Sequence, residues 1–275
     1  MPLALILSSY VAASRVGGMA QALALAALGI DPVVVPTVLF GRHPGRGAPG
    51  GGAVSIETFD GVLAGLEADG CFARADMVIT GYFASGAQVR SAARAIDAVQ
   101  AARPLARVIV DPIMGDAGRL YVAPEVAGAI AADLVPRADL VAPNAWELER
   151  LSGLPVTSPA GAASAARSLG KPMLVSSVPC GGEIGVVYAD AGEAWLASHP
   201  LTAKAPNGAG DLLTALFAAA LIEGLAADRA LARSVGGVVE AVLAAELAGA
   251  DELPIVTLGA RLSQTSPSVR VERLS

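Results

Sequence analysis

The sequence predicts an α/β fold with a mostly parallel central sheet covered by helices on both faces. Short runs of β-branched and aliphatic residues alternate with longer alanine-rich stretches along most of the chain. Most of the short runs are apolar at every position, which is typical of strands that are buried on both faces. Alternation of this kind favours right-handed βαβ crossovers in a doubly wound sheet.

The predicted strands and helices follow one another in a regular order. The six strands are expected at residues 3–7, 33–40, 77–80, 107–111, 139–143 and 173–177. The helices between and around them are expected at residues 17–28, 55–67, 87–102, 124–134, 145–152 and 159–169.

The pattern changes after residue 177. Residues 183–190 and 193–200 are β-rich runs separated by Ala-Gly, which indicates an antiparallel hairpin at one edge of the sheet. We expect the sheet to end there. Two helices rich in alanine and leucine follow at residues 210–222 and 227–247, and a short helical or extended tail follows Pro254.

Composition limits the class of protein. The chain has 275 residues, 54% of them hydrophobic, and no proline-, glycine- or serine-rich linker, so we expect residues 1–275 to form one domain. A net charge of −6 gives no basic field for nucleic acid or an anionic membrane, and neither is an expected partner.

A membrane span and a leader peptide are not expected either. The longest apolar run, residues 212–222, is shorter than the roughly 18 to 20 residues that a spanning helix needs, which favours a buried core helix. The start of the chain has no positive charge ahead of its short apolar run, which argues against a signal peptide and predicts a cytoplasmic protein.

The glycine-rich segment GRHPGRGAPGGG, residues 41–52, contains a G-x-G-x-x-G pattern between Gly45 and Gly50. A dinucleotide site needs this pattern directly after the first strand and at the start of a helix. Here it follows the second strand, and Pro49 interrupts it. We therefore expect a surface loop or a flap beside an active site, and the flap is the more useful hypothesis.

Small or polar residues follow five of the predicted strands, where open parallel sheets bind their ligands. These strand-end residues are Ser8 and Ser9, Gly81 and Tyr82, residues 111–115 (DPIMG), residues 143–147 (PNAWE), and Ser176 and Ser177. We expect them to meet at one edge of the sheet.

Each of these residues has a structural and a functional interpretation. Asp111 precedes a proline and could end its strand in a turn, while Asn144 could cap the next helix with Glu147 completing a capping box. Alternatively, Asp111 and Glu147 are hard oxygen ligands, direct or through water, for Mg²⁺. Tyr82 is either a core aromatic residue or a face on which a flat ring could stack.

The segment KAPNGAGDLLTALF, residues 204–217, combines a glycine-rich turn with the start of an apolar helix. The backbone N–H groups of Gly208, Ala209 and Gly210 can point at one spot beside the positive end of the helix, which predicts an anion site. Asp211 is either the N-terminal cap of that helix or a general base that accepts a proton from an alcohol during phosphoryl transfer. The chain has no Walker motif, so it is not a P-loop enzyme.

The segment PNGAGD resembles the G-x-G-D signature of ribokinase-like small-molecule kinases. Within that superfamily, the chain resembles the pyridoxal kinases along nearly its whole length. The resemblance lies in the order and spacing of SYVAASRVG (9–17), TVLF (37–40) with His43, Gly81 with Tyr82, DPIMG (111–115), APNAWELE (142–149) and PNGAGD (206–211).

The resemblance implies a ribokinase-like three-layer sandwich and ATP-dependent phosphorylation of the 5′-hydroxymethyl group of pyridoxal, pyridoxine or pyridoxamine, in vitamin B6 salvage. It implies ATP and Mg²⁺ as cofactors, pyridoxal as the small-molecule partner, and a homodimer.

The resemblance also implies roles on the substrate side. Ser9 would hydrogen-bond the pyridine ring, and Tyr82 would pack on it. The flap residues His43, Pro44 and Gly45 would close over the ring.

On the nucleotide side, Asp211 would take the hydroxyl proton, and the turn Gly208, Ala209 and Gly210 would bind the transferring phosphate. The residues that would bind ATP are Asp111, Asn144, Glu147, Ser176 and Asn207, with Asp111 and Glu147 also holding Mg²⁺.

The chain departs from this family pattern in four places. Tyr10 stands where many relatives have histidine, residues 14–18 read SRVGG instead of GHAGN, and the flap has Pro-Gly-Arg at residues 44–46. Residues 176–178, SSV, replace a lysine that relatives often place near the nucleotide phosphates. This predicts weaker ATP affinity or a phosphate contact from elsewhere, such as Lys204.

Other functions remain open at this point. A hydroxymethylpyrimidine or hydroxymethylpyrimidine phosphate kinase of thiamine synthesis also acts on a flat ring that carries CH₂OH. A non-catalytic B6-binding protein would tolerate a change of Asp211. A sugar kinase is disfavoured, because no lid of several strands follows the first strand.

Overall fold

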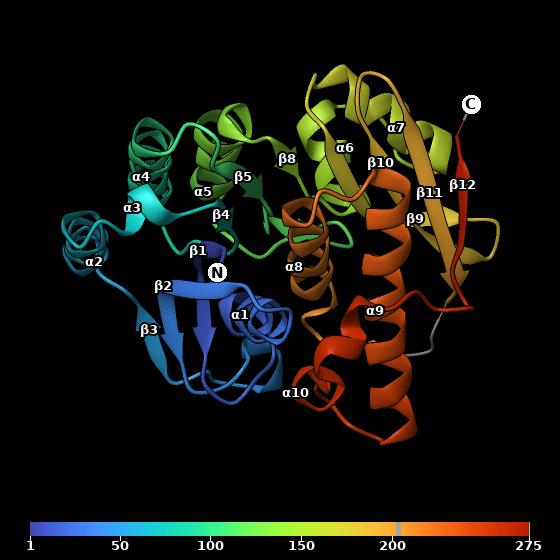
Figure 1. Ribbon diagram of the computed structural model, residues 1–275, viewed down its shortest axis with the longest axis horizontal. Helices are drawn as coiled ribbons and strands as arrows, with labels where there is room; N and C mark the ends of the chain where they lie inside the picture. The colour runs from blue at the N-terminus through green and yellow to red at the C-terminus, as the bar shows by residue number, and fades with distance from the viewer. Residues whose placement is uncertain (202–204, 275) are drawn as a thin grey trace.

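The computed structural model describes residues 1–201 and 205–274. Its main feature is a ten-stranded sheet in the order β12-β11-β10-β9-β8-β5-β4-β1-β2-β3 (Figure 1). The strands are β1 (Leu3–Val11), β2 (Asp31–Phe40), β3 (Gly51–Ala53), β4 (Met77–Thr80), β5 (Arg107–Val110), β8 (Leu140–Val141), β9 (Met173–Cys180), β10 (Glu183–Ala189), β11 (Ala194–Pro200) and β12 (Arg270–Arg273). A separate small ribbon pairs β6 (Gly115–Asp116) with β7 (Arg119–Leu120).

Helices cover both faces of this sheet. One face carries α1 (Gly17–Ala27), α8 (Ala209–Ile222), α9 (Ala227–Leu247) and α10 (Ile255–Leu258). The other face carries α2 (Ile56–Ala68), α3 (Cys71–Arg74), α4 (Gly86–Ala102), α5 (Pro124–Ala129), α6 (Ala145–Ser152) and α7 (Pro159–Ser168). Short helical turns are η1 (Pro44–Arg46), η2 (Ile130–Leu134), η3 (Val135–Arg137) and η4 (Gly259–Ser263).

The sequence of β1 shows why the sheet is buried on both sides. Leu5 and Leu7 belong to the hydrophobic cluster on one face, and Ala4 and Ile6 belong to the cluster on the other. Side chains alternate between the faces of a strand, so an uninterrupted apolar run requires a cover on each side. The six central strands β2, β1, β4, β5, β8 and β9 are all paired in parallel. The predicted three-layer sandwich with a mostly parallel sheet is confirmed.

The predicted hairpin is also confirmed, because β10 and β11 pair antiparallel. The expectation that the sheet ends there is wrong, since β12 adds antiparallel to β11 and aligns Arg273 with Trp195. This edge strand is short and mostly charged and exposed, so it has no apolar pattern. At the other edge, β3 pairs antiparallel with β2 inside the glycine-rich segment.

Helix α8 is the core helix that its apolar run predicts. It packs between α1 and α9, in front of the sheet in Figure 1. Residues 212–220 are all buried. Across residues 1–201 and 205–274, the structure contains no helix long and apolar enough to span a membrane.

Candidate active site

The glycine-rich turn before α8 fits its place only because it contains glycine. Gly208 is the N-cap of the helix and has a φ of 93°. A Cβ atom on Gly208 would lie 2.1 Å from the carbonyl oxygen of Arg15. The turn is therefore pressed against the loop between β1 and α1, and a residue with a side chain would push the two apart.

The first turn of α8 offers free backbone donors. The first intrahelical bond runs from the N–H of Leu212 to the carbonyl oxygen of Gly208, at 2.9 Å. The N–H groups of Ala209 and Gly210 precede it, so they have no acceptor within the helix. They lie at the positive end of the helix dipole, which suits them to an anion.

Asp211 is the third residue of α8, so the interpretation of Asp211 as the N-terminal cap is wrong; Gly208 has that position. The Oδ2 atom of Asp211 accepts the backbone N–H of Gly17 at 2.8 Å. The Oδ1 atom is closed off from solvent and has no hydrogen-bond partner among the described residues. Burial raises the pKa of Asp211 to about 6, and the Gly17 N–H opposes that shift.

Asp211 faces a cavity of about 510 Å³ at the carboxyl ends of the central strands. The ends of β5, β8 and β9, the β10–β11 hairpin, α8 and α9 form its walls. Its lining brings together the predicted nucleotide-side residues Asp111, Asn144, Glu147 and Ser176 with residues 208–211. Asn207 does not line it. A cavity of this volume is typical of a small-molecule site.

Asp111 follows β5 and is joined to α8 by a side chain that sequence reasoning missed. The hydroxyl of Thr214 donates to Asp111 Oδ2 at 2.9 Å. Thr214 lies three residues after Asp211 in a mostly apolar helix, so the two side chains share one face. This spacing is the signal that could have identified Thr214 as a site residue. Burial, and then the charges of Asp211 and Glu147, raise the pKa of Asp111 well above its usual range.

Asn144 and Glu147 form the capping box that their spacing predicts at the start of α6. Glu147 Oε1 also accepts the backbone N–H groups of Met114 at 2.7 Å and Gly115 at 3.2 Å. Asn144 Nδ2 donates to the carbonyl oxygen of Gly115 at 2.8 Å. The pair therefore holds the loop after β5 in place. Burial raises the pKa of Glu147 although these N–H groups oppose the shift.

The backbone is strained at two places in the cavity wall. Ile113 has a φ of 32° and Ser177 a φ of 58°, in the left-handed region that residues with a side chain seldom adopt. Ile113 follows β5, whereas Ser177 lies within β9, which continues to Cys180 and does not end at residue 177 as predicted. Backbone strain of this kind is characteristic of binding sites.

The cavity lining is acidic. Among the described residues, it contains Asp111, Asp116, Glu147 and Asp211 but neither lysine nor arginine. Lys204, the predicted alternative phosphate contact, lies outside the described residues.

These hard oxygen donors suit Mg²⁺. In the part of the chain that the structure describes, no three His, Cys, Asp or Glu side chains are grouped to hold a metal ion. Mg²⁺ is usually bound by one or two protein carboxylates together with substrate phosphates.

The predicted substrate-side residues start from neighbouring strands. Ser9 lies in β1 and Tyr82 follows the adjacent β4. Ser9 is buried, and its Oγ lies 2.0 Å from the point that a Cβ on Gly17 would occupy. Ser9 is therefore beside the backbone that holds Asp211. Tyr82 is half-buried, and its carbonyl oxygen accepts the hydroxyl of Thr37 at 2.6 Å.

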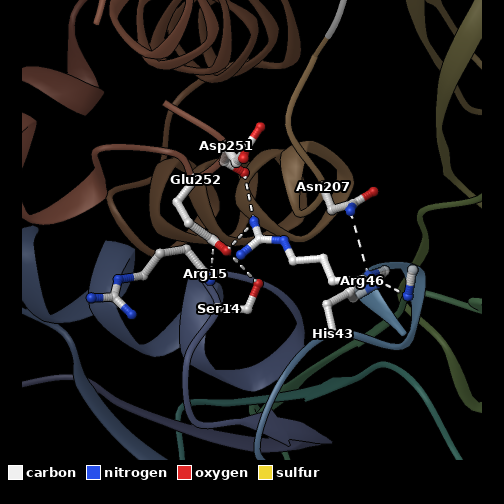
Figure 2. A network of polar contacts seen from close by, with 8 residues as sticks. Ser14, Arg15, His43, Arg46, Asn207, Asp251 and Glu252 are labelled. Atoms are coloured by element: carbon white, nitrogen blue, oxygen red, sulfur yellow. Dashed lines mark hydrogen bonds and ion pairs between the residues drawn. The ribbon is translucent and has the colours of Figure 1, made fainter. Parts of the chain in front are cut away.

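The flap, residues 41–50, joins β2 to β3 and reaches the turn before α8. His43 Nδ1 lies 3.4 Å from Asn207 Nδ2, one residue before the N-cap of that helix (Figure 2). Pro44 and Gly45 are exposed. Ser9, Tyr82 and these flap residues do not line the 510 Å³ cavity, and neither does Asn207, which lies against His43. The structure therefore brings only part of the predicted site residues to the cavity wall.

Known proteins share this architecture and sequence. The family model described as phosphomethylpyrimidine kinase matches residues 68–255. The pyridoxal kinase PdxY of Deinococcus radiodurans is 36% identical over 250 residues, which is 84% of this chain and 83% of that protein. The pyridoxine/pyridoxal/pyridoxamine kinase of Bordetella avium is 35% identical over 89% of this chain and 86% of its own.

Solved structures agree with the sequence matches. The pyridoxal kinase of Leishmania donovani in complex with ADP and pyridoxine superposes with a TM-score of 0.90 at 25% identity, over 99% of each chain. The pyridoxal kinase of Entamoeba histolytica gives a TM-score of 0.92 at 25% identity over the whole of both chains. From the matched length and the identity to these relatives, the chain belongs to the pyridoxal kinases, in the family described as phosphomethylpyrimidine kinase.

Proposed function

We propose that the chain, working as one kinase domain, transfers the γ-phosphoryl group of ATP to the 5′-hydroxyl of pyridoxal, and also of pyridoxine and pyridoxamine. The product would be pyridoxal 5′-phosphate, in vitamin B6 salvage. The observation that carries this proposal is the position of Asp211 in the first turn of α8. Its buried Oδ1 has no hydrogen-bond partner among the described residues, and the N–H groups of the same turn have no acceptor within the helix.

Asp211 is the general base in this proposal. Its Oδ1 takes the proton as the O–H bond of the substrate breaks, and the alkoxide oxygen forms a bond to the γ-phosphorus while the bond to ADP breaks. The Gly17 N–H holds Oδ2 and so keeps Oδ1 directed at the substrate. With a pKa of about 6, Asp211 is ionised at neutral pH and is a stronger base than an ordinary aspartate.

The N–H groups of Ala209 and Gly210 stabilise the charge on the phosphoryl group in flight, because they are fixed at the helix end before the reaction starts. Asp111 would hold Mg²⁺, and Glu147 would act on it through water, since its oxygens already accept backbone N–H groups. Bound there, the cation would neutralise the charge of the phosphates.

Ser9, Tyr82 and the flap residues His43, Pro44 and Gly45 form the ring side of the site in this proposal. Ser176 and Asn144 would contact the nucleotide from the strand ends, and Asn207 would do so from the turn. The homodimer and the cytoplasmic location stay predictions.

The experiment is to incubate the purified protein with ATP and Mg²⁺ and to follow ADP with pyridoxal, pyridoxine, hydroxymethylpyrimidine or ribose as acceptor. We expect pyridoxal to be the best acceptor. Asp211→Asn should lose about 10²- to 10⁴-fold in kcat, the range that general base catalysis supplies, and should still bind both ligands.

Asp228→Asn is the matched control, because Asp228 lies in the first turn of α9, outside the cavity lining. It should keep wild-type turnover. A best rate with hydroxymethylpyrimidine would replace the proposed substrate by that of thiamine synthesis. Near-normal turnover of Asp211→Asn would remove the base assignment whatever the substrate.

A further inference from the structure

The flap has little apolar packing to hold it in place. None of residues 41–50 is buried, and η1 within it buries no side chain. Its backbone pairs with itself near the base, where Gly41 and Arg42 donate to the carbonyl oxygen of Pro49. At the base, the carbonyl oxygen of Gly41 also accepts the backbone N–H of Ala13 at 3.1 Å. Beyond this base, the position of the flap depends on polar contacts at its tip.

Arg46 connects the flap to residues that are far away in the sequence. Its Nη2 lies 2.5 Å from Glu252 Oε1 and donates to the carbonyl oxygen of Asp251 at 2.9 Å (Figure 2). Both acceptors belong to the segment between α9 and α10, 205 and 206 residues further along the chain.

Glu252 is bound from a second direction as well. Its Oε1 accepts the hydroxyl of Ser14 at 2.8 Å, and its Oε2 accepts the backbone N–H of Arg15 at 2.7 Å. Ser14 is itself buried. One carboxylate thus joins the flap to the loop between β1 and α1, residues 12–16.

That loop and the first residue of α1, which follows it directly, touch the proposed phosphoryl-transfer machinery at two points. The carbonyl oxygen of Arg15 lies against Gly208, the N-cap of α8, and Gly17 donates its N–H to Asp211. A shift of this loop would move both the anion-binding turn and the base. Phosphoryl transfer is sensitive to such shifts, because misplacement by about 1 Å can cost 10²-fold in rate.

We propose that Glu252 is a positioning residue for the phosphoryl-transfer site, and that Arg46 binds it to set the flap in register with that site. The proposal rests on the proposed function and extends it to residues that contact neither substrate. The flap closes over the ring side, and the carboxylate that holds it also fixes the loop behind Asp211 and Gly208.

The contact of Glu252 with Arg46 and its contact with the Arg15 N–H have different consequences. The side chain of Arg46 is 36% exposed and that of Glu252 28%, so their ion pair is partly screened and contributes little to global stability. The bond from the Arg15 N–H to Glu252 fixes the backbone of the loop between β1 and α1. Its loss would let Asp211 and Gly208 shift relative to the substrates. Loss of Arg46 should therefore affect substrate binding, and loss of Glu252 should affect turnover.

The kinetic test compares Arg46→Met, Glu252→Ala and Glu252→Gln. Arg46→Met should raise KM for pyridoxal by about threefold to tenfold with kcat within about twofold of wild type, and Arg46→Lys should recover part of that KM. Glu252→Ala should lower kcat by about tenfold to 100-fold. Adding Arg46→Met to Glu252→Ala should raise KM by less than Arg46→Met alone does, because the ion-pair partner of Arg46 is already gone and only its bond to the Asp251 carbonyl oxygen remains.

Arg42→Met is the matched control. Arg42 belongs to the same flap, but its Nε donates to Ala48 within the flap. We expect its KM for pyridoxal to stay within about twofold of wild type. An equal rise of KM in Arg42→Met and Arg46→Met would overturn the proposal, because any loss of charge in the flap would then suffice.

Hydrogen exchange measured on the folded variants tests the coupling without relying on activity. Arg46→Met should speed exchange in residues 41–53 only, and Glu252→Ala should speed it in residues 11–18 as well. Glu252→Gln has nearly the same shape but keeps one oxygen acceptor in place of two, so it should lower kcat in the same direction by less than the alanine variant. It stands in for the alanine variant if that one fails to fold.

Unchanged exchange in residues 11–18 together with normal kcat in both Glu252 variants would overturn the proposal while the kinase assignment stands. If the wild type phosphorylates no B6 vitamer, the proposed function fails. The exchange results then decide by themselves whether Glu252 joins the flap to the loop.

Discussion

At the scale of single residues, the base proposed for catalysis is also a source of instability. The folded-state pKa of Asp211 is about 6, above its ordinary value of 3.8. A carboxyl with a raised pKa favours the folded state when protonated, and that contribution is lost as pH rises through the folded pKa. Above pH 6, ionised Asp211 therefore destabilises the fold by up to about 3 kcal/mol, while its base function requires that same ionised form.

We predict that Asp211→Asn unfolds at a higher temperature than wild type at pH 8, by about 5 °C. The amide oxygen of the substituted side chain can still accept the Gly17 N–H, and no buried charge remains at position 211. The difference should shrink when pH is lowered from 8 to 4.5, because Asp211 becomes protonated in the folded wild type over that interval. Thermal unfolding at both pH values measures it.

The Asp228→Asn variant serves again as control and should show no such pH-dependent gain. If Asp211→Asn and wild type unfold at the same temperature at pH 8, the ionised Asp211 carboxylate does not destabilise the fold. Its pKa is then not raised by burial.

At the scale of elements, a helix start can hold a neighbouring loop as well as cap its own helix. Asn144 caps α6 and also donates to the carbonyl oxygen of Gly115 in the cavity wall. Ser158 caps α7 with a bond from Gly161 N–H to its Oγ, away from the cavity.

We predict that Asn144→Ala and Ser158→Ala each lower the free energy of unfolding by about 1 kcal/mol, the usual effect of removing a cap. Only Asn144→Ala should raise KM for ATP, because it also releases the loop after β5. Urea unfolding and steady-state kinetics give the two numbers. A similar KM change in both variants would mean that lost stability, and not the loop, accounts for it.

The elements that the sequence predicts well are those that are buried on both faces. The central strands are recognisable as apolar runs in the sequence. Parallel topology brings the carboxyl ends of such strands together, so Asp111 and Asn144 could be named as site candidates in advance. The edge strands β3 and β12 could not, because short exposed strands made of glycine or charged residues have no periodic pattern.

Contacts across the chain could not be read from the sequence either. The N–H of Gly17 and the carboxylate of Asp211 are separated by 194 positions, and Ser14 and Glu252 by 238. No spacing rule connects such pairs, since they meet only after α1, α8 and the segment before α10 have packed. The cap interpretation of Asp211 failed for a related reason: the left-handed Gly208 takes the N-cap position, three residues before Asp211.

At the scale of the whole molecule, charge balance sets the conditions for nucleotide binding. The protein carries a net charge of −6, and four of its carboxylates belong to the described cavity lining, which contains neither lysine nor arginine. ATP is itself strongly anionic. Its phosphates can be held by the amides that begin α8, but the surrounding carboxylates repel them unless a cation intervenes.

We predict that ATP with Mg²⁺ raises the unfolding temperature by several degrees and that ATP with a chelator raises it by less than about 1 °C. At a ligand concentration near 100 times Kd, binding adds about 2.7 kcal/mol to the free energy of unfolding. Calorimetry or dye-monitored melting checks this, with Mg²⁺ alone as control. Equal stabilisation by ATP in both buffers would contradict the proposed role of the cation.

The proposed site residues are synthesised at different times, because they lie near opposite ends of the chain. Ser9, Gly17 and the flap belong to the first fifth of the sequence, whereas Asp211 and Glu252 belong to the last quarter. During synthesis, which runs from the N-terminus, the ring side is complete long before the base or the carboxylate that fixes the flap. A chain still being made therefore lacks the proposed base as well as α8 and α9, which cover one face of the sheet. Under the proposed function, it gains phosphoryl transfer only when the polypeptide is nearly finished.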